Sequence, residues 1–385
     1  MRQDPPQRLR QDPERNKINE KKENCMCKNG KIHLAVVFGG RSSEHEVSLK
    51  SAAAVISNAD KEKYDIVQIG ITKDGRWLIF EGEPSSIADG SWQRQAEEAL
   101  AKDPERFAFS VAGSTGRTLA GMADFVFPII HGQYGEDGSI QGLLEQLGLP
   151  YAGSGVTGSA VCMDKSMAKL ICAGAGIPQT PYVFLEAHDI NDEMIREIDE
   201  KLRYPLFVKP AGMGSSVGIT RVAELAGLKA ALFEAASYDS RIVVEQGVRG
   251  RELEVAVMGN EDPKACEIGE ILSAGEFYSY YAKYNDEGSR TVIAPALPEG
   301  KREELLRLAE RCYETLGCEG YARVDFFMDE DGVLLLNEIN TIPGFTSISM
   351  FPMLAQASGL TYSQVIDRII ELGFERAEKR RKLRI

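Results

Sequence analysis

The chain has 385 residues, of which 43% are hydrophobic and 27% charged, a composition typical of a globular protein with two or three domains. Its net charge of −13 argues against a nucleic-acid surface, because phosphate backbones are bound by clustered positive charge. No apolar run reaches the ~20 residues of a membrane span, and the N-terminal segment lacks the apolar stretch of a signal peptide. These features predict a cytoplasmic protein without nucleic-acid or membrane partners.

The seven cysteines have irregular spacing and include no C-x-x-C pair. This pattern favours reduced thiols over a zinc or redox site. Residues 1–29 are polar, charged and proline-containing, which predicts a disordered tail.

The N-terminal part reads as an α/β unit. An apolar run at residues 32–38 ends in two glycines and predicts a buried strand, followed by a helix over 46–58 and a strand over 64–72. This β-α-β order predicts a parallel sheet. A further strand over 125–130 leads into a glycine-rich loop at 131–138.

The middle of the chain begins with a cluster of glycines near residues 150–158, which indicates a domain boundary. A second glycine-rich loop lies at 211–218. The predicted helices span 164–175, 189–202 and 224–237, and the predicted strands span 206–209 and 241–246.

The last third predicts an antiparallel sheet with strands over 253–258, 267–272, 321–328 and 333–339. A helix is expected over 301–316, and residues 361–385 are expected to end in a basic helix with a solvated face. The tyrosine-rich segment 276–298 is too irregular for a strand, and a long loop of this kind is usually functional or disordered.

Residues 321–339 predict a hairpin, because a D-E-D-G turn separates the two extended runs. Side chains alternate along a strand, so Arg323 shares a face with Asp325, and Glu338 with Asn340. With the turn centred near residues 330–331, Asp325 pairs with Leu336 and Arg323 with Glu338. All four polar groups then converge on one side, although a one-residue slip in register would separate them.

Two carboxylates and an amide suit Mg²⁺, which prefers oxygen ligands and shares its coordination with water and phosphate. The pattern therefore predicts a metal site at Asp325, Glu338 and Asn340. The alternative is an arginine–carboxylate cluster on an exposed sheet face. The N-T-I-P-G sequence at 340–344 favours the metal site, since a tight turn there presents backbone N–H groups beside it.

Six motifs resemble, in the same order, those of the D-alanine–D-alanine ligase family of the ATP-grasp superfamily. They cover the chain from residue 31 to the C-terminus. The motifs are residues 39–48 (GGRSSEHEVS), 131–138 (HGQYGEDG), 163–165 (MDK), 208–210 with 214–218 (VKP and GSSVG), 282–284 (AKY) and 337–346 (NEINTIPGFT).

The resemblance implies an ATP-grasp fold, α/β and α+β, in three domains. After the tail at 1–29, these are an N-terminal parallel-sheet substrate domain (30–152), a central lid domain (153–245) and a C-terminal catalytic domain (246–385). ATP is expected between the last two domains. The family also implies a homodimer through the N-terminal domain.

Two lysines are expected at the ATP phosphates, because a lysine is a compact cation suited to multiply charged oxygens. Lys209 also ends an apolar strand beside a glycine-rich loop, whose backbone N–H groups can approach phosphate closely. The resemblance places Ser215 over the γ-phosphate and Glu245 and Glu252 at the adenine edge and ribose hydroxyls. The implied ATP-binding residues are Lys165, Lys209, Ser215, Glu245, Glu252 and Lys283.

The resemblance also implies the amino-acid sites. Glu46 would bind the ammonium group of the first D-alanine, with His131 nearby. The residues alone favour another role for Glu46, since Ser43 and Glu46 have the spacing of a helix capping box. Ser349 and Met350 would bind the carboxylate of the second D-alanine, together with Lys283, which lies in the same lid segment as Tyr284.

The implied reaction joins two D-alanines through a D-alanyl phosphate, for peptidoglycan precursor synthesis, with ATP and two Mg²⁺ or Mn²⁺ ions. Arg323 and the Gly344 N–H would stabilise the tetrahedral oxyanion, and Tyr284 would latch the lid towards Ser215 and Glu46. The implied catalytic residues are Glu46, Ser215, Tyr284, Arg323 and Gly344. A D-alanine–D-serine or D-alanine–D-lactate ligase and a non-catalytic nucleotide-binding module are the alternatives.

Overall fold

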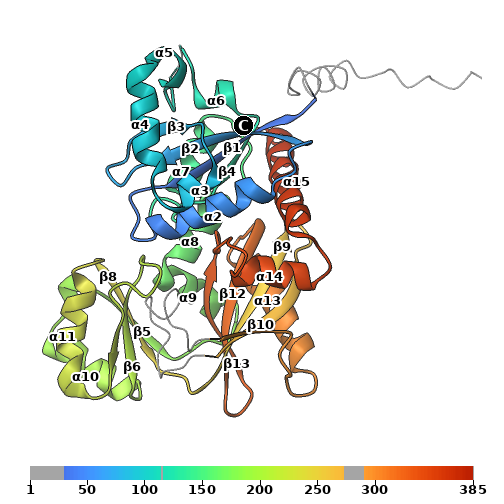
Figure 1. Ribbon diagram of the computed structural model, residues 1–385. Helices are drawn as coiled ribbons and strands as arrows, with labels where there is room; N and C mark the ends of the chain where they lie inside the picture. Colours follow the sequence, from blue (N-terminus) through green and yellow to red (C-terminus); the bar gives the residue numbers. More distant parts are fainter. Residues whose placement is uncertain (1–29, 114–115, 273–289, 385) are drawn as a thin grey trace, which may run out of the picture.

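The computed structural model describes residues 30–113, 116–272 and 290–384, and this part of the chain forms three β-sheets (Figure 1). None of its helices has both the length and the apolar composition needed to cross a membrane. Residues 1–29 and 276–289, for which a tail and part of a long loop were predicted, lie outside the described residues.

The N-terminal sheet has the strand order β3-β2-β1-β4. β1 (Ile32–Gly39) pairs in parallel with β2 (Tyr64–Ile71) and β4 (Phe125–Pro128), which confirms the predicted parallel sheet. β3 (Trp77–Phe80), which was not predicted, adds an antiparallel edge. The helices of this part are α2 (His45–Asn58), α3 (Pro84–Ala88), α4 (Trp92–Lys102), α5 (Pro104–Phe107), α6 (Leu119–Met122) and α7 (Ser139–Gln146).

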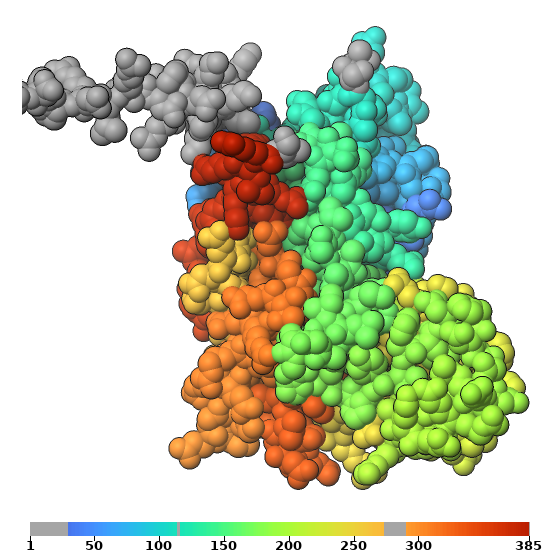
Figure 2. Space-filling model, turned by 180° about the vertical axis from the view of Figure 1, so that it is seen from behind, coloured from blue at the N-terminus to red at the C-terminus, as the bar shows by residue number. Residues whose placement is uncertain are grey.

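The central sheet has the antiparallel order β5-β8-β6-β7 and a hydrophobic core made only of residues between 183 and 244. We call residues 182–246 the central lobe, which lies at the lower right in Figure 2, beside the residues coloured green. Its elements are β5 (Tyr182–Glu186), a short 3-10 turn (Ala187–Asp189), α10 (Asp192–Lys201), β6 (Leu206–Pro210), β7 (Thr220–Val222), α11 (Leu225–Ala236) and β8 (Arg241–Gln246).

The C-terminal sheet has the order β11-β10-β9-β12-β13 and is antiparallel, as predicted. One expectation was wrong, because β11 (Arg290–Ile293) lies within the segment judged too irregular for a strand. The other elements are α8 (Val156–Met163), α9 (Lys165–Gly174), β9 (Gly250–Gly259), β10 (Lys264–Leu272), α13 (Lys301–Thr315), β12 (Gly320–Asp329) and β13 (Leu334–Asn340).

The β12–β13 hairpin differs from the predicted register by two residues. Arg323 pairs with Asn340 and Asp325 with Glu338. The turn is centred half a residue later than expected, which moves each pairing partner by one residue, and a β-bulge between Asp325 and Phe326 moves it by one more. A shift of two residues preserves the face of every side chain. The four polar groups therefore still lie on one side of the sheet.

The chain ends in α14 (Met350–Ala357) and α15 (Tyr362–Arg381), and α15 lies against the N-terminal sheet (Figure 1). The basic last turn of α15 is exposed, as predicted, but the rest of the helix packs against the protein. Its apolar face is buried, and the Arg376 guanidinium donates to the carbonyls of Tyr151 and Gly153. A single hydrophobic core consequently includes residues of the N-terminal sheet, α14, α15 and the C-terminal sheet.

Candidate active site

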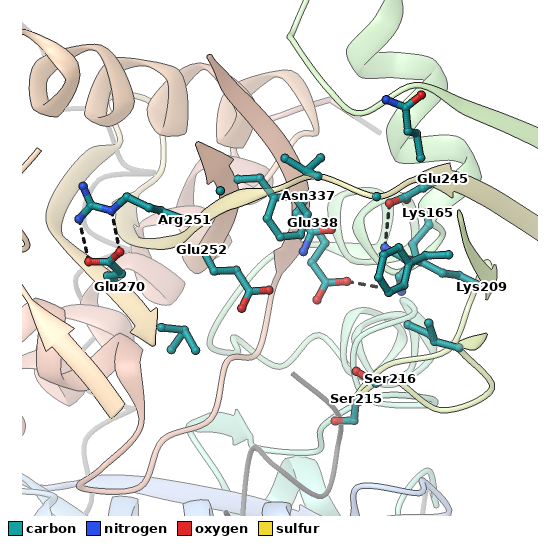
Figure 3. Close-up of a pocket in the computed structure, with 18 of the residues that line it drawn as sticks. Lys165, Lys209, Ser215, Ser216, Glu245, Arg251, Glu252, Glu270, Asn337 and Glu338 are labelled. Atoms are coloured by element: carbon teal, nitrogen blue, oxygen red, sulfur yellow. Dashed lines mark hydrogen bonds and ion pairs between the residues drawn. The ribbon is translucent and has the colours of Figure 1, made fainter. Parts of the chain in front are cut away.

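Two cavities adjoin where the three sheets approach one another. The first has a volume of about 440 Å³, within the usual range for small-molecule sites, and lies between the central lobe and the C-terminal sheet (Figure 3). The second, about 250 Å³, lies between the C-terminal sheet and the N-terminal loops. Lys165, Ser215 and Glu338 line both, so a molecule in one cavity can reach a molecule in the other.

A buried ion cluster borders the first cavity. Glu245 on β8 accepts from Lys209 on β6 at 2.8 Å and lies 3.2 Å from the Nζ of Lys169 on α9. Burial alone would raise the pKa of Glu245, but the two lysines outweigh it and lower the pKa to about 2. The cluster holds Lys209 at the cavity wall, where a lysine suits the oxygens of a phosphate.

Lys169 was missed by the sequence analysis. It follows Lys165 by four residues on α9, so the two lysines lie on one face of the helix, and this spacing was the available signal. Lys165 donates to the carbonyl of Met213 at 2.7 Å and lies 3.5 Å from Glu338. Glu252 lines the same cavity, beside the bidentate Arg251–Glu270 pair (Figure 3).

The glycine-rich loop at 211–218 reaches across to the N-terminal domain. Its Ser215 has a left-handed φ of 50° and donates a hydrogen bond from its hydroxyl to Glu44. A Cβ at Gly214 would come within 2.8 Å of the Glu44 carboxylate, so a larger residue here would require that side chain to shift. The contact joins the central lobe to the cavity that Glu44 lines.

The structure brings Glu44, and not Glu46, into the second cavity. Glu44 is buried, whereas the Glu46 side chain is 57% exposed and is paired with Lys73. The capping box predicted from Ser43 and Glu46 is also absent, since α2 begins after Glu44 with no side-chain cap. Sequence analysis named Glu46 for this site, but α2 begins at His45, so Glu44 precedes the helix and Glu46 lies in its first turn.

Arg323 lies at the base of the second cavity between two carboxylates. Its Nε and Nη2 donate to Asp325, each at 2.7 Å, and its Nε is 3.1 Å from Glu254 on the neighbouring strand β9. Burial alone would lower the pKa of Arg323, but the two carboxylates raise it well above its ordinary value. Arg323 is therefore a fixed cation, and Glu254 is a cavity residue that the sequence analysis missed.

The predicted metal ligands lie together on β12 and β13. Asn340 donates through Nδ2 to Asp325 at 2.9 Å, so its Oδ1 is the atom that can ligate a metal. In the described part of the chain no cluster of three or more His, Cys, Asp or Glu side chains is arranged to hold a metal. The set fits Mg²⁺ all the same, because that ion is usually held by one or two carboxylates and by substrate phosphates.

His131 lines the second cavity, but both of its ring nitrogens already contact the protein. Nδ1 lies 2.8 Å from the carbonyl of Ile342, and Nε2 lies 2.9 Å from the Ser51 hydroxyl. Burial lowers the pKa of His131, which keeps the ring neutral. The structure thus gives His131 contacts within the protein where a substrate contact was expected.

Glu136, another residue missed from the sequence, is buried in the same cavity. It accepts from the backbone N–H groups of Gly132 at 2.9 Å and Ile342 at 2.8 Å. Burial, and next the charge of Glu44, raise its pKa to about 8.

The far wall of the second cavity is the segment after β13. Gly344, Ser349 and Met350 all line it, as expected for residues near the amino-acid substrates. Ser349 accepts from the Thr346 N–H at 3.0 Å and is the residue before α14. Lys283 and Tyr284, predicted for the lid, lie outside the described residues.

Two protein-family profiles match this chain. The profile described as D-ala D-ala ligase N-terminus matches residues 33–154, and the profile described as D-ala D-ala ligase C-terminus matches residues 171–371. The D-alanine–D-alanine ligase of Thermoanaerobacter sp. (strain X514) is 47% identical over 348 residues, which are 90% of this chain and 97% of that protein.

The chain belongs to the D-alanine–D-alanine ligase family.

Two solved structures of this family have the same architecture. The D-alanine–D-alanine ligase from Coxiella burnetii is 37% identical, with a TM-score of 0.79 over 91% of this chain and 96% of that one. The VanG D-Ala:D-Ser ligase from Enterococcus faecalis is 36% identical, with a TM-score of 0.77 over 89% of this chain and 99% of that one. The predicted ATP-grasp fold and family resemblance are confirmed, while the exact domain boundaries remain a prediction.

Proposed function

We propose that this D-alanine–D-alanine ligase family member joins two D-alanines at the expense of ATP, with ATP in the first cavity and the amino acids in the second. The observation that supports this most is the junction of the cavities. Lys165, Ser215 and Glu338 line both, and Arg323 and Gly344 lie on the amino-acid side. A phosphoryl group can therefore pass from one cavity to the other without leaving the protein.

In the first step, a carboxylate oxygen of the first D-alanine attacks the γ-phosphorus, the bond to ADP breaks, and a D-alanyl phosphate forms. Glu44 pairs with the ammonium group of this D-alanine, and Arg323 holds its carboxylate. Lys165 and Lys209 neutralise the phosphate oxygens, whose charge is the main barrier to this transfer. A divalent ion held by Asp325, Glu338 and Asn340, when bound, supplies further positive charge to the same oxygens.

In the second step, the amine of the second D-alanine attacks the carbonyl carbon, and the tetrahedral oxyanion collapses with loss of phosphate and one proton. Arg323 and the Gly344 N–H are the proposed oxyanion donors. Ser349 and the Met350 N–H bind the incoming carboxylate, with Lys283 as a further partner. Water would hydrolyse the acyl phosphate, and the 211–218 loop, which already touches Glu44, helps to exclude it.

A phosphate-release assay with ATP and single amino acids tests this function. We expect release that depends on D-alanine and on Mg²⁺ or Mn²⁺, with D-alanyl-D-alanine as the product. The VanG relative makes D-alanine–D-serine ligation the second candidate. Competition between D-alanine, D-serine and D-lactate separates these reactions, and we expect D-alanine to be used, because the thioether of Met350 is a weak partner for a serine hydroxyl. No D-alanine-dependent release would exclude the proposal.

Glu44→Gln and Glu46→Gln form a matched pair that tests the ammonium site. We expect Glu44→Gln to raise the KM for D-alanine by about tenfold or more, since a hydrogen bond between charged groups contributes about 1.5–3 kcal/mol. Glu46→Gln should change this KM by less than about twofold, because its exposed pair with Lys73 contributes little. The reverse order of effects would restore Glu46 as the substrate ligand.

A homodimer, which the family resemblance implies, and a cytoplasmic location, which was predicted from the composition, both stay predictions. Sedimentation of the purified protein tests the first of these directly.

A further inference from the structure

The segment after β13 is held by three buried residues of the N-terminal domain. Glu136 accepts from the Ile342 N–H at 2.8 Å, and Ser51 accepts from the Phe345 N–H at 3.1 Å. His131 contacts the Ile342 carbonyl through Nδ1 at 2.8 Å. These hydrogen bonds hold the chain on both sides of Gly344, at residues 342 and 345.

The hydrogen-bond directions follow from the chemistry. A carbonyl oxygen can only accept, so Nδ1 of His131 carries the proton and Nε2 of the neutral ring accepts from the Ser51 hydroxyl. The Ser51 oxygen in turn accepts from Phe345. A series of hydrogen bonds thus runs from Phe345 through Ser51 and His131 to Ile342. Each group in this series fixes the orientation of the next.

Ser51, His131 and Glu136 are themselves held in place by their surroundings. Ser51 is fully buried on α2, and His131 and Glu136 are also buried. Glu136 has a second backbone contact, from the Gly132 N–H at 2.9 Å, so the 131–136 loop is fixed at both of its ends. A donor aimed at a developing charge is effective only when such surroundings hold it in place.

We propose that Ser51, His131 and Glu136 are positioning residues, which hold the 342–345 segment so that the Gly344 N–H meets the tetrahedral oxyanion. This inference rests on the proposed function, because that function assigns the oxyanion to Gly344. It also explains why His131 lines the substrate cavity while its ring nitrogens contact the protein.

Ser51→Ala and Ser48→Ala provide the matched test. Both serines are fully buried on α2, and the Ser48 hydroxyl bonds only to Gly39 and Ile129 of the N-terminal domain in the described structure. We expect Ser51→Ala to lower kcat by roughly 10- to 100-fold, as a small misplacement of a catalytic group does, with the KM for ATP nearly unchanged. Ser48→Ala should leave kcat within about twofold of the wild type.

Hydrogen exchange of the peptide covering residues 341–346 gives a second measurement that needs no turnover. Ser51→Ala should speed exchange in this peptide and leave β12 unchanged, whereas Ser48→Ala should affect neither. Equal kcat and equal exchange in the two serine variants would overturn the proposal. If the wild type makes no dipeptide, the function fails, but the exchange experiment still tests the positioning.

Glu136→Gln keeps the proposal falsifiable if Ser51→Ala does not fold. It retains one acceptor oxygen and should also lower kcat and speed exchange of the 341–346 peptide. The double variant of Ser51 and Glu136 should lose little more kcat than the worse single variant, because both act on one segment. Independent, multiplicative losses would contradict a shared role.

Discussion

Replacing Arg323 with alanine is expected to lower kcat for dipeptide synthesis by about 10²–10³-fold or more, since a single oxyanion donor is typically worth about 2.7–4 kcal/mol. Arg323 combines that proposed role with a fixed charge between Glu254 and Asp325. ATP binding should remain measurable, because Lys165 and Lys209 line the other cavity. Single-turnover phosphate and dipeptide assays, with calorimetric titration of ATP, measure both properties.

The variant Arg323→Lys tests whether the positive charge at this position is sufficient or whether the shape of the guanidinium group is also needed. A lysine retains the positive charge but not the planar fork that contacts both oxygens of Asp325. We therefore expect a folded protein with partial activity, between those of the wild type and the alanine variant. Undiminished turnover in Arg323→Ala would rule out its assigned role.

Glu245→Gln is expected to reduce the free energy of unfolding by about 3–5 kcal/mol, because removal of one member of a buried ion cluster leaves uncompensated charge. The variant leaves Lys169 and Lys209 next to each other without an anion between them. Glu267→Gln is the control, since its partner Arg302 is substantially exposed, and its loss should cost no more than about 1 kcal/mol. Urea unfolding at neutral pH measures both.

The effect of Glu245→Gln should depend on pH. The pKa of Glu245 falls from 4.5 to about 2 on folding. A lowered folded-state pKa stabilises the protein above the unfolded value and loses this stabilisation as the pH falls. The difference between wild type and variant should therefore be constant above about pH 5 and shrink by about 1.4 kcal/mol per unit below pH 4.5. A difference that persists undiminished at pH 3.5 would contradict this cluster.

The β12–β13 hairpin shows which features of the site could be predicted from the sequence and which could not. Alternation placed Arg323, Asp325, Glu338 and Asn340 on one face correctly, because the side-chain period of a strand is two. The pairing partners were wrong, since neither the position of the turn nor a bulge at Asn337 has a clear signal in a single sequence. The errors in the turn and in the bulge together shift the pairing by two residues, an even number. For this reason alone the predicted site residues stayed on one face of the sheet.

Contacts between distant segments were the least predictable part of the site. Glu254, Glu136 and Ser51 meet their partners only through tertiary packing, so spacing along the chain could not identify them. The choice between Glu44 and Glu46 depended on where α2 begins, and helix ends are the least certain feature of a helical pattern.

The hydrophobic core that spans the N-terminal sheet, α15 and the C-terminal sheet has a further consequence for how substrates enter. These parts share buried side chains and should move together as one rigid body, whereas the central lobe has a hydrophobic core of its own. We expect the nucleotide cavity to open when the central lobe rotates as a second rigid body. The hinges would be its two connections to the rest of the chain, near residues 181 and 247. The amino-acid cavity would keep its shape throughout that motion except where Ser215 parts from Glu44.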